Sequence, residues 1–178
     1  NKQFCLLVRT IIESRLGRMK WEERLRHLKE AIAYTIPNFS EVCIAQWPLC
    51  RQEIMILNDI ANTYARLGNV NEALEIFKNI MEFYQTSEVD IFYHIETITM
   101  TIYNYTKWLG NLGRYEETIE LYEMAIKINI HTGRGRILGG LLYGKAWSLR
   151  KISEINIKAC QRYCRQAYYI SNIMKEER

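Results

Sequence analysis

Two stretches of this chain share one pattern of apolar and turn residues: Leu57 to Phe77, and Ile102 to Tyr122. In each stretch, apolar side chains recur with helical spacing, a glycine follows, and a second helical run comes after it. Gly68 marks the turn of the first stretch and Gly113 the turn of the second. One such hairpin has too little core of its own, so repeated hairpins must stack, and stacking builds an extended binding surface. The pattern therefore predicts a protein that binds a ligand or partner, and not an enzyme.

Both stretches resemble the tetratricopeptide repeat (TPR), a helical hairpin of about 34 residues. The two turn glycines are 45 positions apart, so the second of these hairpins needs a longer first helix than the standard repeat has. We therefore expect a stack that is less regular than consensus TPR arrays. The positions that carry the pattern are Leu57, Ile60, Ala61, Tyr64, Gly68, Ala73 and Phe77 in the first stretch, and Ile102, Tyr105, Thr106, Leu109, Gly113, Tyr115, Thr118, Tyr122 and Ala125 in the second.

Helical periodicity continues on both sides of these stretches. It predicts an all-α fold, a TPR-like right-handed superhelix of about four antiparallel helical hairpins that forms a single domain over residues 1–178. A connector between Pro37 and Pro48 should contain a short helix over residues 40–46. The main helices are expected over residues 2–16, 20–35, 49–67, 72–85 with Asn71 as the cap, 87 or 88 to 112, 115–130, 137–151, and 154–175 with Ser153 as the cap.

The last predicted hairpin has two unusual features. Gly139 and Gly140 lie inside a helix, where each costs about 1 kcal/mol relative to alanine. The compensating gain is either a close approach of two helices or room for a ligand. The final helix carries an apolar stripe that either caps the stack or forms the seam of a homodimer.

Composition and spacing argue against several classes of function. No run of about 18 apolar residues is present, so we expect no membrane span. The three histidines lie far apart in separate hairpins, and the five cysteines have no zinc-site spacing. We therefore expect no catalytic residues, no metal, no cofactor and no enzymatic activity, and we expect reduced thiols in a cytoplasmic protein.

Basic residues are in excess near both ends of the chain, and acidic residues are in excess in the middle. This arrangement is compatible with a nucleic-acid contact at one end. Because the basic residues are spread along helices and not clustered in a tract, we favour ordinary solvated helix faces.

The candidate binding residues lie on the first helix of each hairpin, which lines the concave face of TPR folds. Asparagine side chains donate and accept hydrogen bonds at once, so a row of them can hold an extended peptide backbone. Basic side chains can then bind a carboxylate. The alternative is that these are ordinary polar residues on the wet face of a helix. The candidates are Asn58, Asn62 and Arg66, then Tyr103, Asn104 and Lys107, and, less securely placed, Lys145.

An ordered set of segments resembles one known family. The segments are residues 28–37 (LKEAIAYTIP), 51–61 (RQEIMILNDIA), 112–121 (LGRYEETIEL), 142–149 (LYGKAWSL) and 166–170 (QAYYI). In this order they resemble the Firmicute-type helix-turn-helix transcriptional regulators with a C-terminal TPR-like domain, which include the XRE-class, Rgg-like peptide receptors. One departure is that Arg150-Lys-Ile stands where the fourth hairpin would have its turn glycine.

The resemblance implies a sensor of short signalling peptides, as in quorum sensing, in which Asn58 and Asn62 hold the peptide backbone. It also implies that the chain is a fragment preceded by a DNA-binding domain of the lambda-repressor type, through which alone it would contact DNA. Two other functions remain open. One is a TPR scaffold for protein partners, and the other is a TPR protein that regulates an enzyme or acts as a phosphatase on response regulators.

Overall fold

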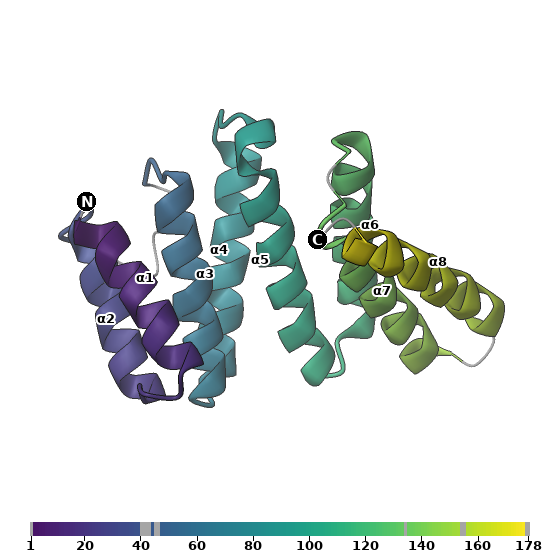
Figure 1. Ribbon diagram of the computed structural model, residues 1–178, viewed down its shortest axis with the longest axis horizontal. Helices are drawn as coiled ribbons and strands as arrows, with labels where there is room; N and C mark the ends of the chain where they lie inside the picture. The colour runs from purple at the N-terminus through teal and green to yellow at the C-terminus, as the bar shows by residue number, and fades with distance from the viewer. Residues whose placement is uncertain (1, 40–43, 45–46, 134, 154–155, 177–178) are drawn as a thin grey trace. The chain divides into compact units, whose positions relative to one another are not determined.

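The computed structural model describes residues 2–39, 44, 47–133, 135–153 and 156–176 (Figure 1). This part of the chain contains eight α-helices and no β-strand, which confirms the predicted all-α, TPR-like fold of four hairpins. The chain divides into two compact units, Asn1–Val89 and Asp90–Arg178. The helices are α1 (Lys2–Arg15), α2 (Trp21–Ala33), α3 (Arg51–Arg66), α4 (Val70–Thr86), α5 (Ile91–Asn111), α6 (Tyr115–His131), α7 (Leu138–Ile152) and α8 (Ile157–Glu176).

The first unit consists of the hairpins α1–α2 and α3–α4, and α2 packs against α3. Gly17 and Gly68 form the two turns with φ of 68° and 93°, values that glycine adopts without the steric cost of a β-carbon. The apolar faces predicted from periodicity meet in one core. Its fully buried members include Leu28, Ile54, Leu57, Ile60, Phe77 and Ile80.

A chain of amides and one hydroxyl ties the first unit together at its interior. Gln3 of α1 is buried, and its Nε2 donates to Oγ1 of Thr35 over 2.7 Å. Gln52 of α3 donates through Nε2 to Oε1 of Gln3 over 2.5 Å. Because both ends of the buried Gln3 amide are satisfied, this polar group joins helices far apart in the sequence without a desolvation penalty.

The second unit consists of the hairpins α5–α6 and α7–α8, and α6 packs against α7. The first helices of the two hairpins, α5 and α7, also touch each other. Gly113 turns the first hairpin with φ of 76°. The buried apolar side chains of this unit include Ile95, Ile102, Leu109, Ala125, Leu141 and Ala146.

Two predicted helix starts are wrong. Asn69, not Asn71, is the N-cap residue of α4, and the helix begins at Val70. Helix α5 begins at Ile91 and not at residue 87 or 88, because the Asp90 side chain accepts a hydrogen bond from the Phe92 amide over 2.9 Å and caps the helix there.

Two further predictions fall largely outside the described residues. The short helix predicted over residues 40–46 lies outside the described residues, apart from Ile44, which is buried. The predicted start of the last helix, at residue 154, also lies outside the described residues. Ser153 is the C-cap residue of α7. None of the helices in the described segments has both the length and the apolar character that a membrane crossing requires.

Candidate functional site

The second unit contains an open cavity of ≈ 290 Å³ between α5, α6 and α7. Two of these helices, α5 and α7, are the first helices of their hairpins, which is where the sequence predicted the binding surface. Residues with aromatic rings and glycines predominate in the lining. The lining residues are Tyr103, Thr106, Lys107, Gly110 and Asn111 of α5, Tyr122 of α6, and Gly140, Tyr143, Gly144, Trp147 and Ser148 of α7.

Two helical glycines give the cavity its shape. A β-carbon at Gly144 would collide with the ring of Tyr122, whose Cε1 would be 2.8 Å away. A β-carbon at Gly140 would lie 3.2 Å from Cε2 of Tyr103. Both tyrosine rings can therefore lie against the backbone of α7 only because these two positions carry no side chain. Burial raises the pKa of Tyr122, so its phenol is neutral at physiological pH.

A third glycine of α7 has a different role. A β-carbon at Gly139 would be 2.6 Å from Oγ of Ser171 and 3.3 Å from the carbonyl oxygen of Ala167, both on α8. The sequence allowed two explanations for the pair Gly139 and Gly140, a close approach of two helices and room for a ligand. Each explanation applies to one of the two residues. Gly139 permits close packing of α7 on α8, and Gly140 lines the cavity.

The polar groups behind the cavity already have partners within the unit. Thr118 of α6 donates through Oγ1 to Oγ of Ser148 over 2.6 Å, in a fully buried contact between α6 and α7. Thr106 donates to the carbonyl oxygen of Ile102 over 2.8 Å. Because these hydroxyls are satisfied, the inner wall offers a ligand mainly aromatic surface.

Two lysines carry positive charge at or next to the cavity, because Lys107 is a lining residue and Lys151 contacts the lining residue Trp147. The Nζ of Lys107 lies 5.5 Å from the ring centre of Trp108, and the Nζ of Lys151 lies 4.8 Å from that of Trp147. Neither lysine has an ion-pair partner among the described residues. Among the described residues, no aspartate or glutamate lines the cavity. A ligand that fits here would be apolar in its buried part and neutral or anionic at the rim.

The structure divides the predicted binding residues between the two units. Tyr103 and Lys107 line the cavity, as the repeat register indicated. Asn104 follows Tyr103 on α5 and is half-buried, but it is not part of the lining. Lys145 is buried beside the cavity, and its Nζ donates to Oε1 of Glu123 and to the Tyr163 hydroxyl, each over 2.9 Å.

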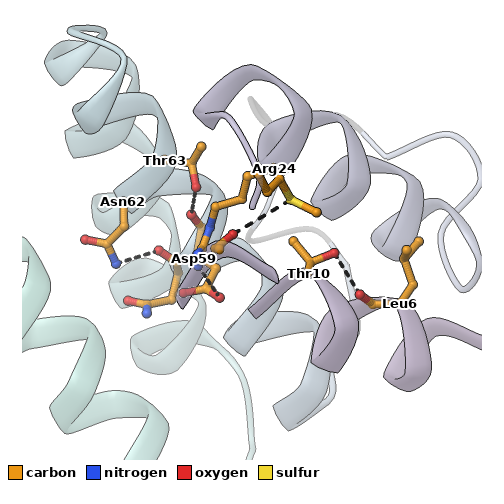
Figure 2. Close-up of polar contacts among 9 residues, drawn as sticks. Leu6, Thr10, Arg24, Asp59, Asn62 and Thr63 are labelled. Carbon is orange, nitrogen blue, oxygen red and sulfur yellow. Dashed lines mark hydrogen bonds and ion pairs between the residues drawn. The ribbon is translucent and has the colours of Figure 1, made fainter. Parts of the chain in front are cut away.

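The other three predicted residues, Asn58, Asn62 and Arg66, lie on α3 in the first unit, and Figure 2 shows Asn62. Asn58 is buried, and Asn62 donates through Nδ2 to the Asn58 carbonyl oxygen over 2.9 Å. The guanidinium of Arg66 is exposed and lies 5.7 Å from the ring centre of Trp21.

An ion pair beside these residues connects α2 and α3. Arg24 of α2 donates through Nη2 to Oδ2 of Asp59 over 3.1 Å, and Thr63 donates to the carbonyl oxygen of Asp59 over 2.7 Å (Figure 2). Burial raises the pKa of the Asp59 carboxyl, and the neighbouring Arg24 opposes that shift. This part of α3 is therefore held to α2 by a largely buried pair of charges.

Sequence reasoning missed most of the aromatic lining of the cavity, including Tyr122, Tyr143 and Trp147. A signal was present on α7, where Gly140 and Gly144 are four residues apart and Tyr143 and Trp147 repeat the same spacing. Residues four apart share one face of a helix, so the glycines and the aromatic rings form two adjoining rows.

The described residues show neither a metal site nor a disulfide near the cavity. In the segments that the structure describes, no three His, Cys, Asp or Glu side chains gather into a group that could hold a metal ion. Cys5, Cys50, Cys160 and Cys164 are free thiols. Cys160 is buried, and its Sγ lies 3.4 Å from the carbonyl oxygen of Ala146, so this thiol packs α8 onto α7.

With the fold and the cavity established, comparison with known proteins identifies the family. The family model for the RNPP family C-terminal domain matches residues 1–177. The chain belongs to the RNPP family. This match confirms the resemblance to regulators with a C-terminal TPR-like domain that the ordered segments had indicated.

Solved structures similar to this RNPP domain include two of PlcR from Bacillus thuringiensis. The apo form has a TM-score of 0.77 at 21% identity, covering 98% of this chain and 61% of the PlcR chain. The complex of PlcR with the peptide PapR7 and DNA has a TM-score of 0.61 at 21% identity, covering 98% of this chain and 65% of the PlcR chain. At this identity the likeness shows a shared fold, and the RNPP domain spans less than two thirds of the PlcR chains. No curated protein sequence gives a significant match.

Proposed function

We propose that this RNPP domain is the peptide-sensing part of a transcriptional regulator and that a short peptide binds in the cavity of the second unit. The observation that carries the proposal is the open cavity between the first helices of two hairpins, lined by aromatic rings and by Lys107, with Lys151 beside the lining residue Trp147. Ligand sites are typically concave and apolar, with a few polar groups that fix orientation. The PlcR complex with a peptide and DNA supports a peptide as the ligand class.

The proposed mechanism is a shift between arrangements of the hairpins. A peptide that contacts α5 and α7 together binds best to one arrangement of the two helices and so increases its population. A DNA-binding domain attached to the chain would respond to that shift, and the regulator would contact DNA only through it. Such a regulator works where the DNA is, in the cytoplasm.

Residues outside the cavity have a secondary place in this proposal. Asn104 remains a candidate for holding peptide backbone in the second unit. Asn58, Asn62 and Arg66 remain separate candidates for a contact with peptide in the first unit. We leave Lys145 out of the binding site, because Glu123 and Tyr163 already hold its ammonium group.

We propose a homodimer that uses α8. Tyr168, Tyr169 and Ile173 are exposed on this helix, and exposed apolar side chains gathered on one element mark interaction surfaces. If the protein is entirely monomeric in solution at high concentration, this part of the proposal is wrong.

Affinity selection from a library of synthetic peptides of five to eight residues tests the function. We expect a small set of peptides to be retained, and we expect Trp147→Ala to abolish retention because this half-exposed ring lines the cavity. Tyr93→Ala is the control, since it removes an exposed aromatic ring of α5 that does not line the cavity. A protein that retains no peptide but binds a folded partner through the same face would instead be a scaffold.

A further inference from the structure

We propose that the outer face of α1 is an interface inside a longer helical stack. Its partner is an amphipathic helix, the second helix of a further hairpin that directly precedes residue 1 in the full-length regulator. This interface belongs to the first unit and does not involve the cavity of the second.

Helix α1 has two faces that avoid water. Its three buried residues face the interior of the first unit, where α1 packs on α2. On the neighbouring side, four apolar side chains recur at intervals of four residues, from Phe4 through Val8 and Ile12 to Leu16. Leu16 continues the last turn, since its amide donates to the Ile12 carbonyl oxygen over 3.0 Å. Residues four apart share one face of a helix, so these side chains form a continuous stripe.

The stripe is open to solvent. Phe4, Ile12 and Leu16 are 53%, 49% and 55% exposed, and Val8 is half-buried. A stack of helical hairpins needs a polar outer face on its terminal hairpin, because that face meets water. The outer face of α1 lacks this property, so α1 has the character of an interior helix of a stack.

The repeat inside the first unit indicates which neighbour this face takes. Aligning the turn glycines of the hairpins α1–α2 and α3–α4 places Val8 at the position of Asp59 and Ile12 at that of Thr63. In α3, Asp59 pairs with Arg24 of α2 over 3.1 Å, and Thr63, one turn further on, is 1% exposed. This face of α3 is therefore covered by α2, the second helix of the preceding hairpin. By the same register, the stripe on α1 fits the second helix of a hairpin before it.

The two equivalent faces differ in chemistry, and the difference describes the covering helix. Where α3 presents the carboxylate of Asp59 to an arginine, α1 presents Val8. The helix on α1 should therefore carry an apolar stripe of its own. Arg9 and Arg15 are exposed beside the stripe, so acidic side chains that flank the apolar stripe of the partner would be complementary to them.

The stacking order places the covering helix directly before α1 in the sequence. Within each unit, the second helix of one hairpin packs on the first helix of the next, α2 on α3 and α6 on α7. Consecutive elements of a chain are usually neighbours in space, and one hairpin of this kind takes about 34 residues. The matched part covers only 61% of the apo PlcR chain, so a regulator of that length has room for one more hairpin.

The thiol of Cys5 can report on this face. It is exposed and lies seven residues before Ile12, so both are on the same side of α1. Alkylation by iodoacetamide, followed for each cysteine by mass spectrometry, is compared between the full-length regulator and the 178-residue chain. We expect Cys5 to react about tenfold or more slowly in the full-length regulator, which corresponds to a docking free energy of about 1.4 kcal/mol. Cys50, an exposed thiol at the start of α3, is the control and should react equally in both proteins.

A charge placed in the stripe tests the contact directly. In the full-length regulator, Ile12→Glu should restore the alkylation of Cys5 to its rate in the 178-residue chain. Ile130→Glu is the matched control, because it changes an exposed apolar side chain of α6 in the second unit, and it should leave Cys5 protected. Since Ile12 is half-exposed, the circular dichroism of the 178-residue chain should be the same with and without Ile12→Glu.

Three results would overturn the proposal. Equal reactivity of Cys5 in both wild-type proteins would show that nothing covers α1. Protection of Cys5 in the 178-residue chain that increases with protein concentration would show that a second copy covers it. Protection that persists in a full-length variant lacking only the segment of about 34 residues before residue 1 would assign the cover to another part of the regulator.

Discussion

The Nζ of Lys145 lies 2.9 Å from Oε1 of Glu123, and the two residues differ sharply in exposure. Lys145 of α7 is 7% exposed, whereas the side chain of Glu123 on α6 is 47% exposed. The same ammonium donates to the hydroxyl of Tyr163 on α8 over 2.9 Å. One buried cation therefore connects three helices of the second unit. Burial disfavours its charge, but the hydrogen bonds to Tyr163 and Glu123 outweigh burial and raise the pKa of Lys145.

Glu123→Ala should lower the free energy of unfolding by about 1 kcal/mol, because it leaves a buried ammonium with one acceptor fewer. The full cost of breaking a buried ion pair does not apply, since Glu123 is half-exposed and water screens it. Urea unfolding followed by circular dichroism measures the change. Glu120→Ala removes an exposed carboxylate one turn earlier on α6 and should stay within about 0.5 kcal/mol of wild type. If both variants change the free energy of unfolding equally, the ion pair between Lys145 and Glu123 contributes nothing to stability.

The same contact predicts a pH dependence. The hydrogen bond from Lys145 holds the pKa of Glu123 below its ordinary value of 4.5. A carboxyl whose pKa is lower in the folded state contributes stability that is present above the unfolded pKa and is lost as pH falls through the folded pKa. The stability difference between wild type and Glu123→Gln should therefore be full at neutral pH and disappear in acid. A difference that stays constant from neutral to strongly acidic pH would rule out this ionic origin.

Gly144→Ala should destabilise the second unit by about 1–3 kcal/mol, because overpacking a close contact forces side chains and backbone to shift. The added β-carbon would collide with the Tyr122 ring. Gly110→Ala is the matched control, since a β-carbon at that helical position meets no atom within 4 Å. It should stabilise the protein by about 0.5–1 kcal/mol through helix propensity alone. Thermal unfolding of both variants decides the point, and a stabilised Gly144→Ala would show that Tyr122 can move away.

The sequence was sufficient to predict the helices and most turns, because these depend on local features. Gly68 and Gly113 were assigned to turns from their place after an apolar run, and both have positive φ. The start of α4 was wrong because Asn69 and Asn71 are equally suitable N-cap residues. Only the backbone of the folded chain distinguishes them.

The cavity was only partly predictable, because it depends on contacts between three helices. Repeat register predicted Tyr103 and Lys107 as groove residues of α5, and both line the cavity. The same reasoning placed Lys145 at a binding surface, yet its side chain is buried against Glu123 and Tyr163. Whether a polar side chain at a given register meets solvent or a partner is decided by residues distant in sequence, which periodicity cannot reveal.

The ion pair of the first unit gives a last prediction, about Arg24. The side chains of Arg24 and Asp59 are 14% and 24% exposed, so removing the arginine leaves a carboxylate largely buried without its counter-charge. Breaking a fully buried pair in this way costs about 3–5 kcal/mol. Because Asp59 keeps some contact with water, we expect Arg24→Met to lower the free energy of unfolding by about 2 kcal/mol, measured by urea unfolding.

Arg26→Met is the control for this variant, since Arg26 forms an exposed pair with Glu23 on the same helix, 3.8 Å apart. Such surface pairs contribute about 0–1 kcal/mol.

The pH dependence adds an independent test. Burial already raises the pKa of Asp59 and Arg24 counteracts it, so without Arg24 the pKa rises further. A carboxyl group whose pKa is higher in the folded state than in the unfolded state stabilises the fold in acid. This contribution is lost as the pH rises through the folded pKa. The cost of Arg24→Met should therefore be largest at neutral pH and shrink in acid, and a cost independent of pH would place its cause in lost packing against Trp21.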